Sequence, residues 1–162
     1  MLTAHLPSGY CFGKISGIKG WTFAAAVFGA VFPDIDLIFF YFIDDRAVHH
    51  HRYWVHIPFF WLVVASISLP FLLRSRFKAA ALAFSAAILM HLLLDSISGG
   101  ILWLAPFDME LHQLVTVSAT HSHWILSFIF HWTFTLELLI WSLAFFLFFK
   151  SRRAKSKAAP KE

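Results

Sequence analysis

The sequence predicts an all-α fold, a polytopic membrane helix bundle with about four transmembrane spans. Composition is the first observation behind this prediction. Of 162 residues, 59% are hydrophobic and 14% are charged, whereas a soluble domain carries about 25% charged residues. The mean hydropathy of +0.71 agrees, and twenty Phe and seven Trp suit a surface that faces lipid. The second observation is that long apolar runs alternate with short polar or basic segments, as expected when helices cross a bilayer.

The first long apolar run is interrupted by charge. Residues 21–43 are apolar, but Pro33 breaks the run, and Asp34 and Asp36 follow at once. Because Pro lacks a backbone donor and disfavours helix at the preceding residue, this segment is either one kinked span or two half-helices. Residues 1–20 are too broken by Pro and Gly to form a full span. The other spans are expected at 57–73, 79–95 and 124–149.

The length indicates one domain. Residues 1–149 are expected to form a single integral-membrane helical domain, followed by a basic, disordered cytoplasmic tail at 150–162. Residues 1–10 lack the basic and apolar regions of a cleavable signal peptide, and Cys11 is alone, so no intrachain disulfide is expected. Much of the net charge of +4 lies in the tail. We therefore expect the lipid bilayer as a partner and no nucleic acid; the oligomeric state is left open.

Basic residues predict the orientation in the membrane. The loop at 74–78 and the tail from 150 carry Lys and Arg, and the positive-inside bias places such segments in the cytoplasm. Segments 44–56 and 96–123 then lie on the periplasmic side of a bacterial inner membrane.

The N-terminus conflicts with this arrangement. Lys14 and Lys19 suit a cytoplasmic position. The nearby His5 is then separated from the periplasmic side unless residues 5–20 fold back into the membrane.

The polar residues at the end of the third span are the main anomaly of the chain. His91 and Asp95 are four residues apart with three leucines between them, so in a helix they share one face. Both are costly to place in lipid unless they share a metal ion, a proton or each other. The alternative is a hydrogen-bonded pair that stabilises the end of a helix.

Two further groups are expected at the same membrane depth. Asp34 and Asp36 lie in the outer half of the first span, although one of them could serve as a helix cap. His51 and His56 precede the second span, where the alternative is a solvated loop. Arg52 lies between them and could hold a phosphate or pair with an Asp. Separate stretches of chain thus bring His or Asp to one depth.

The chemistry of these groups indicates a hydrolytic metal site. Carboxylates and imidazoles without a thiolate suit Zn, Mn or Fe rather than a structural zinc site. A bound ion would activate water and polarise an ester. His112, His121 and His123 are expected to be exposed loop residues. His131 is expected to form a hydrogen bond in the core.

In their order along the chain, these residues resemble the YdjM-type inner-membrane metal-dependent hydrolases. The motifs are Ala4-His5-Leu6, Pro33-Asp34-Ile35-Asp36, His51-Arg52 with His56, His91 with Asp95, and Trp103-Leu104-Ala105-Pro106-Phe107, within residues 1–110. That family is distantly similar to the zinc-dependent phospholipase C and single-strand nuclease superfamily. The resemblance implies metal-ligand roles for His5, Asp34, Asp36, His51, His56, His91 and Asp95. Tyr53, Val55 and Ile57 stand where the family usually has Gly, Thr and Ser, and Leu37 stands where it often has His.

The combined prediction is a membrane-bound hydrolase that uses a divalent metal, with Zn favoured over Mn or Fe. The expected substrate is a phosphoester, including lipid or lipid-linked ones. Asp36 would be a ligand or a general base, and Arg52 would steady the phosphate. The alternative is a non-catalytic membrane protein that carries or senses a metal ion or proton through the same cluster, and a third reading is a structural protein with a degenerate site.

Overall fold

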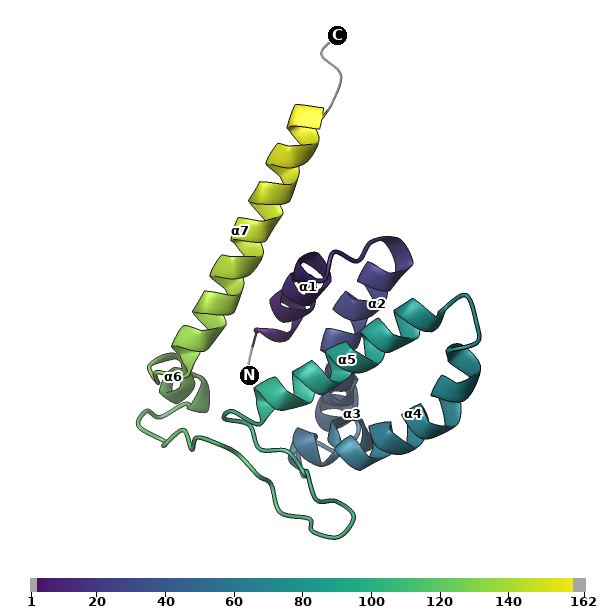
Figure 1. Cartoon of the computed structure of the whole chain (residues 1–162). Coiled ribbons are helices and arrows are strands. Elements are labelled where there is room, and N and C mark those ends of the chain that lie inside the picture. The colour runs from purple at the N-terminus through teal and green to yellow at the C-terminus, as the bar shows by residue number, and fades with distance from the viewer. Residues whose placement is uncertain (1–2, 159–162) are drawn as a thin grey trace.

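The structure, a computed structural model that describes residues 3–158, is built from helices (Figure 1). Within that range there is no strand, only an isolated antiparallel bridge between Ile101 and His112, so the all-α prediction is confirmed. The α-helices are α1 (His5–Ile15), α2 (Gly20–Val31), α3 (Asp36–Phe42), α4 (Pro58–Leu72), α5 (Lys78–Asp95), α6 (Trp124–Ile129) and α7 (Phe134–Ala158). The 3-10 helices are η1 (Phe32–Ile35), η2 (His50–Arg52) and η3 (Trp54–His56).

Three helical segments in the described part of the chain are long and apolar enough to cross a membrane. They are Gly20–Phe42 with 23 residues, Lys78–Asp95 with 18 and Phe134–Ala154 with 21. A span needs about 20 residues to cross a hydrocarbon layer of about 30 Å. The expected span at 57–73 is shorter than this, because α4 has 15 residues.

The first span is one continuous helical segment rather than two separate half-helices. α2, η1 and α3 follow one another without a break from Gly20 to Phe42. Pro33 lies in the first turn of η1, a position at which a helix tolerates the missing N–H. The 3-10 turn is tighter than an α-helix, and it is the place where Asp34 and Asp36 enter the fold.

The expected span at 124–149 is divided in the structure. α6 ends at Ile129, and α7 begins only at Phe134. α7 then continues to Ala158, so residues 150–158 are helical where the sequence predicts a disordered tail. Residues 159–162 of that tail lie outside the described residues.

Close packing between α2 and α5 forms the centre of the bundle, and α1 packs against α2 and touches α5 (Figure 1). Gly29 permits this approach, because a Cβ atom there would lie 2.6 Å from the carbonyl oxygen of Phe84. The buried apolar cluster consists of Ile88, Leu92 and Ile101. The end of α5 is therefore embedded in protein rather than facing lipid.

α7 stands to one side of the bundle and packs against α1 (Figure 1). Glu137 of α7 is fully buried. Its Oε2 accepts hydrogen bonds from the backbone N–H of Thr3 at 2.9 Å and from the Thr3 hydroxyl at 2.7 Å. The Trp141 indole also donates to the Thr3 hydroxyl oxygen. This polar contact holds the start of α1, where His5 lies.

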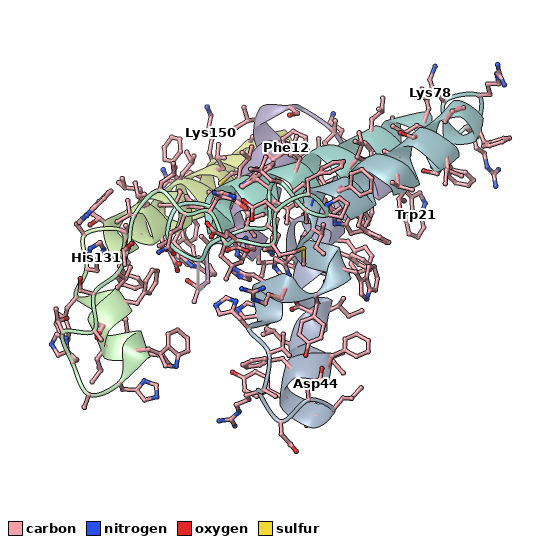
Figure 2. All side chains as sticks on the ribbon, turned by 90° about the horizontal axis from the view of Figure 1, so that it is seen from below. Phe12, Trp21, Asp44, Lys78, His131 and Lys150 are labelled. Carbon is pink, nitrogen blue, oxygen red and sulfur yellow. The ribbon has the colours of Figure 1, made fainter. Side chains whose placement is uncertain are left out.

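Most basic residues gather at one end of the bundle, whereas Arg46 and Arg52 lie at the other end, between α3 and η3. The former lie at the turn from α1 to α2, at the turn from α4 to α5 and on the last turns of α7, which are on the upper side of Figure 1. Viewed from below, Lys78 lies at a different extremity from the loop that carries Asp44 (Figure 2). These residues are Lys14, Lys19, Arg74, Arg76, Lys78, Lys150, Arg152 and Arg153.

Candidate metal centre

The residues that the sequence predicts as metal ligands meet at the end of the bundle that is opposite to the basic turns. α1 begins with His5, and α5 ends with His91 and Asp95. Asp36 begins α3, and His51 and His56 lie in η2 and η3. The N-terminal segment does fold back, since α1 and α2 form a helical hairpin that returns His5 to the level of Asp95.

Asp95 is the centre of the cluster. Its side chain is 1% exposed, and its carboxylate faces the Nε2 atoms of four histidines. The distances are 3.0 Å from His5 and from His91, and 3.5 Å from His51 and from His56. His5 also stacks on His91, with ring centroids 3.7 Å apart. A carboxylate and several imidazoles at this spacing are the donor set of a metal site.

Backbone carbonyls determine which ring nitrogen carries the proton in two of these histidines. His91 Nδ1 lies 2.7 Å from the carbonyl oxygen of Ala30. His51 Nδ1 lies 3.0 Å from the carbonyl of Gly99 and 2.8 Å from that of Gly100. Because a carbonyl can only accept, Nδ1 is the donor in both rings. In the neutral imidazole the Nε2 lone pair then points into the cluster, as in histidines that ligate metals.

His56 is held by a carboxylate instead. Its Nδ1 donates to Asp36 Oδ2 at 2.5 Å, and both side chains are fully buried. Its Nε2 lies 3.2 Å from His91 Nε2. Two lone pairs cannot face one another at this distance without repulsion, so a proton or a cation must lie between these groups. The carboxylate–imidazole pair of Asp36 and His56 is the arrangement that orients a metal-binding histidine.

The protonation of the two loop histidines differs. Burial lowers the pKa of His51 to about 3, so this ring is neutral at pH 7. Burial also acts to lower the pKa of His56, but the carboxylates of Asp36 and Asp95 outweigh it and raise that pKa to about 9. Without a cation, the His56 ring is therefore protonated on both nitrogens, with Nδ1 toward Asp36 and Nε2 toward Asp95. A metal ion would take the place of the Nε2 proton.

Three overlapping groups in the described chain have ligand atoms within 4.8 Å of one another, close enough to hold an ion. They are His5 with His91 and Asp95, Asp34 with His56 and His91, and His50 with His51 and His56. His91 and His56 each belong to two groups, so neighbouring ions could share them. The cluster opens at two half-buried members, His50 and Asp34, whose side chains are 27% and 31% exposed.

His50 is a candidate that the sequence analysis did not select. It is the middle residue of a run of three histidines, and adjacent side chains usually point in different directions. The short 3-10 helix η2 turns both His50 and His51 toward His56. His50 Nδ1 also lies 3.7 Å from Asp36 Oδ1. The run of three adjacent histidines was the only feature of the sequence that pointed to His50.

Two predicted site residues lie outside the three groups of potential ligands found in the described chain. Arg52 is exposed, and its guanidinium donates to the carbonyl of Met109 at 3.3 Å, so the structure does not bring it into the cluster. Asp36 contacts His56 and His50, and it is absent from the groups of potential ligands found among the described residues. Its predicted role as a ligand or general base stays a prediction, whereas its contact with His56 is observed.

The remaining histidines lie apart from the centre. His112 is partly exposed and pairs with Asp108 at 3.6 Å. His121 bonds to its neighbour Thr120, and His131 bonds to Thr133. The junction between α6 and α7 at His131 projects to the side of the molecule (Figure 2).

The residues that replace the usual family motif have structural partners. The Tyr53 hydroxyl donates to Asp44 Oδ2. Val55 is 1% exposed, and its carbonyl accepts a hydrogen bond from the Trp61 indole at 2.7 Å. The backbone between His51 and His56 is therefore held by other contacts than those of Gly, Thr and Ser.

The apolar helices and the buried cluster define a helical membrane protein with a His/Asp centre that could hold a metal ion. The chain belongs to the YdjM inner membrane protein family, whose model matches residues 2–158. This confirms the family that the short motifs predicted and extends it over nearly the whole chain. No curated protein and no solved structure matches the chain.

Proposed function

We propose that the chain is a membrane-bound, metal-dependent hydrolase that acts on a phosphoester. The observation that supports this most is the convergence of imidazole Nε2 atoms on Asp95 while the Nδ1 atoms of His51, His56 and His91 are taken up by other acceptors. Such a set binds a cation with little rearrangement. Zn suits these nitrogen and oxygen ligands, and Mn or Fe would also fit them.

The proposed ligands are the residues that form the three groups. His5, His91 and Asp95 would hold one ion at the most buried part, and Asp34, His50, His51 and His56 would complete the centre. Bound there, the metal would supply a polarised water and a Lewis acid for the phosphoryl oxygen. The similarity to the phospholipase C and nuclease superfamily is part of this proposal.

The neighbouring residues have positioning roles in this scheme. Asp36 keeps the Nδ1 proton on His56, which leaves the Nε2 atom for the cluster. Substrate would approach at Asp34 and His50, the half-exposed members. Beside Asp34, the apolar side chains of Ile35 and Ile38 are 40% and 54% exposed. This favours a substrate with a lipid part that reaches the centre from the bilayer.

The orientation belongs to the same proposal. The basic turns and the last turns of α7 would face the cytoplasm by the positive-inside bias, and the metal centre would face the periplasm. The chain would then form one integral-membrane domain over residues 1–149, with the basic end of α7 on the cytoplasmic side.

The second candidate function is binding or transport of a metal ion or proton. The buried position of the His56 ring, 2.5 Å from Asp36 Oδ2 and 3.5 Å from Asp95 Oδ2, favours it. A transporter also needs a polar path to the other side of the membrane. Neither α2 nor α4 carries an ionisable residue, and α5 carries none between Lys78 and His91. These three helices offer no such path, which favours the enzyme.

The test combines metal content and activity. Purified protein in detergent is compared with His91→Ala and Asp95→Ala, with His112→Ala as a control that removes a histidine outside the cluster. We expect bound Zn in the wild type and the control and its loss from the two cluster variants. Hydrolysis of a chromogenic phosphodiester or of a phospholipid should follow the metal content. Equal metal content in all four proteins would refute the site. Bound metal without hydrolysis of either substrate would favour the second function.

A further inference from the structure

A second site lies at the basic end of the bundle, between the N-terminal hairpin and α7. A cleft of about 390 Å³ is lined by Tyr10 and Lys14 of α1, Phe23 of α2, and Phe148, Ser151 and Arg152 of α7. None of these residues is acidic, and neither Lys14 nor Arg152 forms an ion pair with another described residue. The cleft therefore presents two positive charges to its contents.

An apolar groove of about 340 Å³ continues from this cleft toward the middle of the bundle. Tyr10, Phe23 and Phe148 line both spaces, so the two are continuous. Beyond them the groove is lined by apolar side chains of the same three helices, which include Val27 and Ala144.

The groove follows one face of α7. Trp141, Phe145, Phe148 and Arg152 are spaced by three or four residues, which places them on one side of a helix. From Trp141 to Arg152 this face is about 17 Å long at 1.5 Å per residue. Half of a hydrocarbon layer of about 30 Å is about 15 Å. The groove is thus as long as one leaflet is deep, with its charges at the end where the headgroups lie.

We propose that this composite site binds an anionic phospholipid. The phosphate lies in the cleft between Lys14 and Arg152, and one acyl chain lies in the groove between α1, α2 and α7. Basic clefts between membrane helices bind anionic headgroups in this way. The lipid would fill the space beside α7, since α7 packs against α1 and only 11% of its membrane-spanning window is buried inside the protein.

Aromatic rings hold the two cations in place. Lys14 Nζ lies 5.5 Å from the ring centroids of both Tyr10 and Phe23. The Arg152 guanidinium lies 5.4 Å from the centroid of Phe148. These contacts leave the charges without a counter-ion and keep them at the mouth of the groove. The phosphate supplies the negative charge that the lining residues lack.

The chain offers a matched control for the test. The variant Lys14→Gln with Arg152→Gln removes both charges from the cleft. The control, Lys19→Gln with Arg153→Gln, removes two charges from the same end of the bundle at exposed positions that do not line the cleft. Binding of phosphatidylglycerol and of phosphatidylcholine with the same acyl chains is measured by native mass spectrometry of the full chain. The melting temperature without added lipid reports the fold of each variant.

We expect the wild type to prefer phosphatidylglycerol. Each basic side chain near a phosphate contributes about fivefold in affinity, so the cleft variant should bind phosphatidylglycerol about 30-fold more weakly, while the control keeps its affinity within about threefold. Equal losses in the two variants would mean diffuse charge attraction and would overturn the proposal. So would a wild type that does not distinguish the two lipids. Displacement of the lipid by millimolar inorganic phosphate would show that the groove contributes nothing, which also overturns it.

Discussion

Replacing Gly99 with alanine perturbs the metal centre without altering a proposed ligand. A Cβ atom at this position would lie 2.4 Å from His51 Cε1 and 3.1 Å from His51 Nδ1. Ordinary contact between carbon atoms begins near 3.5 Å, so the ring must move away by about 1 Å. The φ angle of Gly99 is not in the positive region, so the substitution acts through this clash rather than through backbone strain.

The clash has a calculable effect on metal affinity. His51 Nδ1 is held by the carbonyls of Gly99 and Gly100 at 3.0 and 2.8 Å, and a movement of about 1 Å breaks both hydrogen bonds. Ligand distances in metal sites are kept within about 0.2 Å, so the same movement takes Nε2 out of its ligand position. Changes to groups that hold a ligand in place reduce metal affinity by about 10–100-fold. We expect a loss of this size in Gly99→Ala.

Competition with a zinc chelator on purified protein in detergent measures the affinity. Gly17→Ala is the control, because φ at Gly17 is +66° and no atom lies within 4 Å of an added Cβ. It strains a turn far from the cluster and should lower stability while leaving zinc affinity unchanged. An affinity in Gly99→Ala equal to that of the wild type, or lowered no more than in the control, would refute the assignment of His51 as a ligand.

Three further predictions concern the residues around the centre. Asp36→Asn keeps the shape of the side chain but removes the charge that orients His56, so zinc affinity in the chelator assay should fall about 10–100-fold; an unchanged value would contradict the positioning role. His50→Gln should lower the number of bound ions measured by elemental analysis, whereas His121→Gln, which changes a histidine whose ring bonds to its neighbour Thr120 and lies outside the groups, should not. Arg52→Gln should leave metal content unchanged, because its guanidinium bonds to a carbonyl outside the cluster; a lowered metal content would argue against this placement.

The fold class and the pairing of His91 with Asp95 could be predicted from the sequence, because both depend on local properties. Hydrophobic composition determines which solvent the helices require, and a spacing of four residues places two side chains on one helix face. Helix ends were harder to predict. The predicted fourth span merges α6 and α7, since apolar composition continues through the break at residues 130–133.

The position of His5 shows what local patterns could not provide. Its motif implies a ligand, whereas Lys14 and Lys19 predict a cytoplasmic position for the same segment, on the opposite side from the centre. The hairpin of α1 and α2 removes this conflict: the lysines lie at its turn and His5 lies at its far end, 3.0 Å from Asp95. The sequence could not place the side chains of His50 and Arg52 for a related reason, since the direction of side chains in η2 depends on contacts with Asp36, His56 and the loop at Met109.

The sequence by itself determined that this is a helical membrane protein of the YdjM family, and it identified most of the ionisable residues that the fold brings together. Those properties follow from composition and from spacing within single helices. The tertiary structure alone decided which nitrogen of each histidine faces Asp95, that Asp36 bonds to His56, and that a basic cleft opens beside α7. Each of these depends on backbone carbonyls or side chains that lie far away along the chain, and only the packing of the helices brings them into contact.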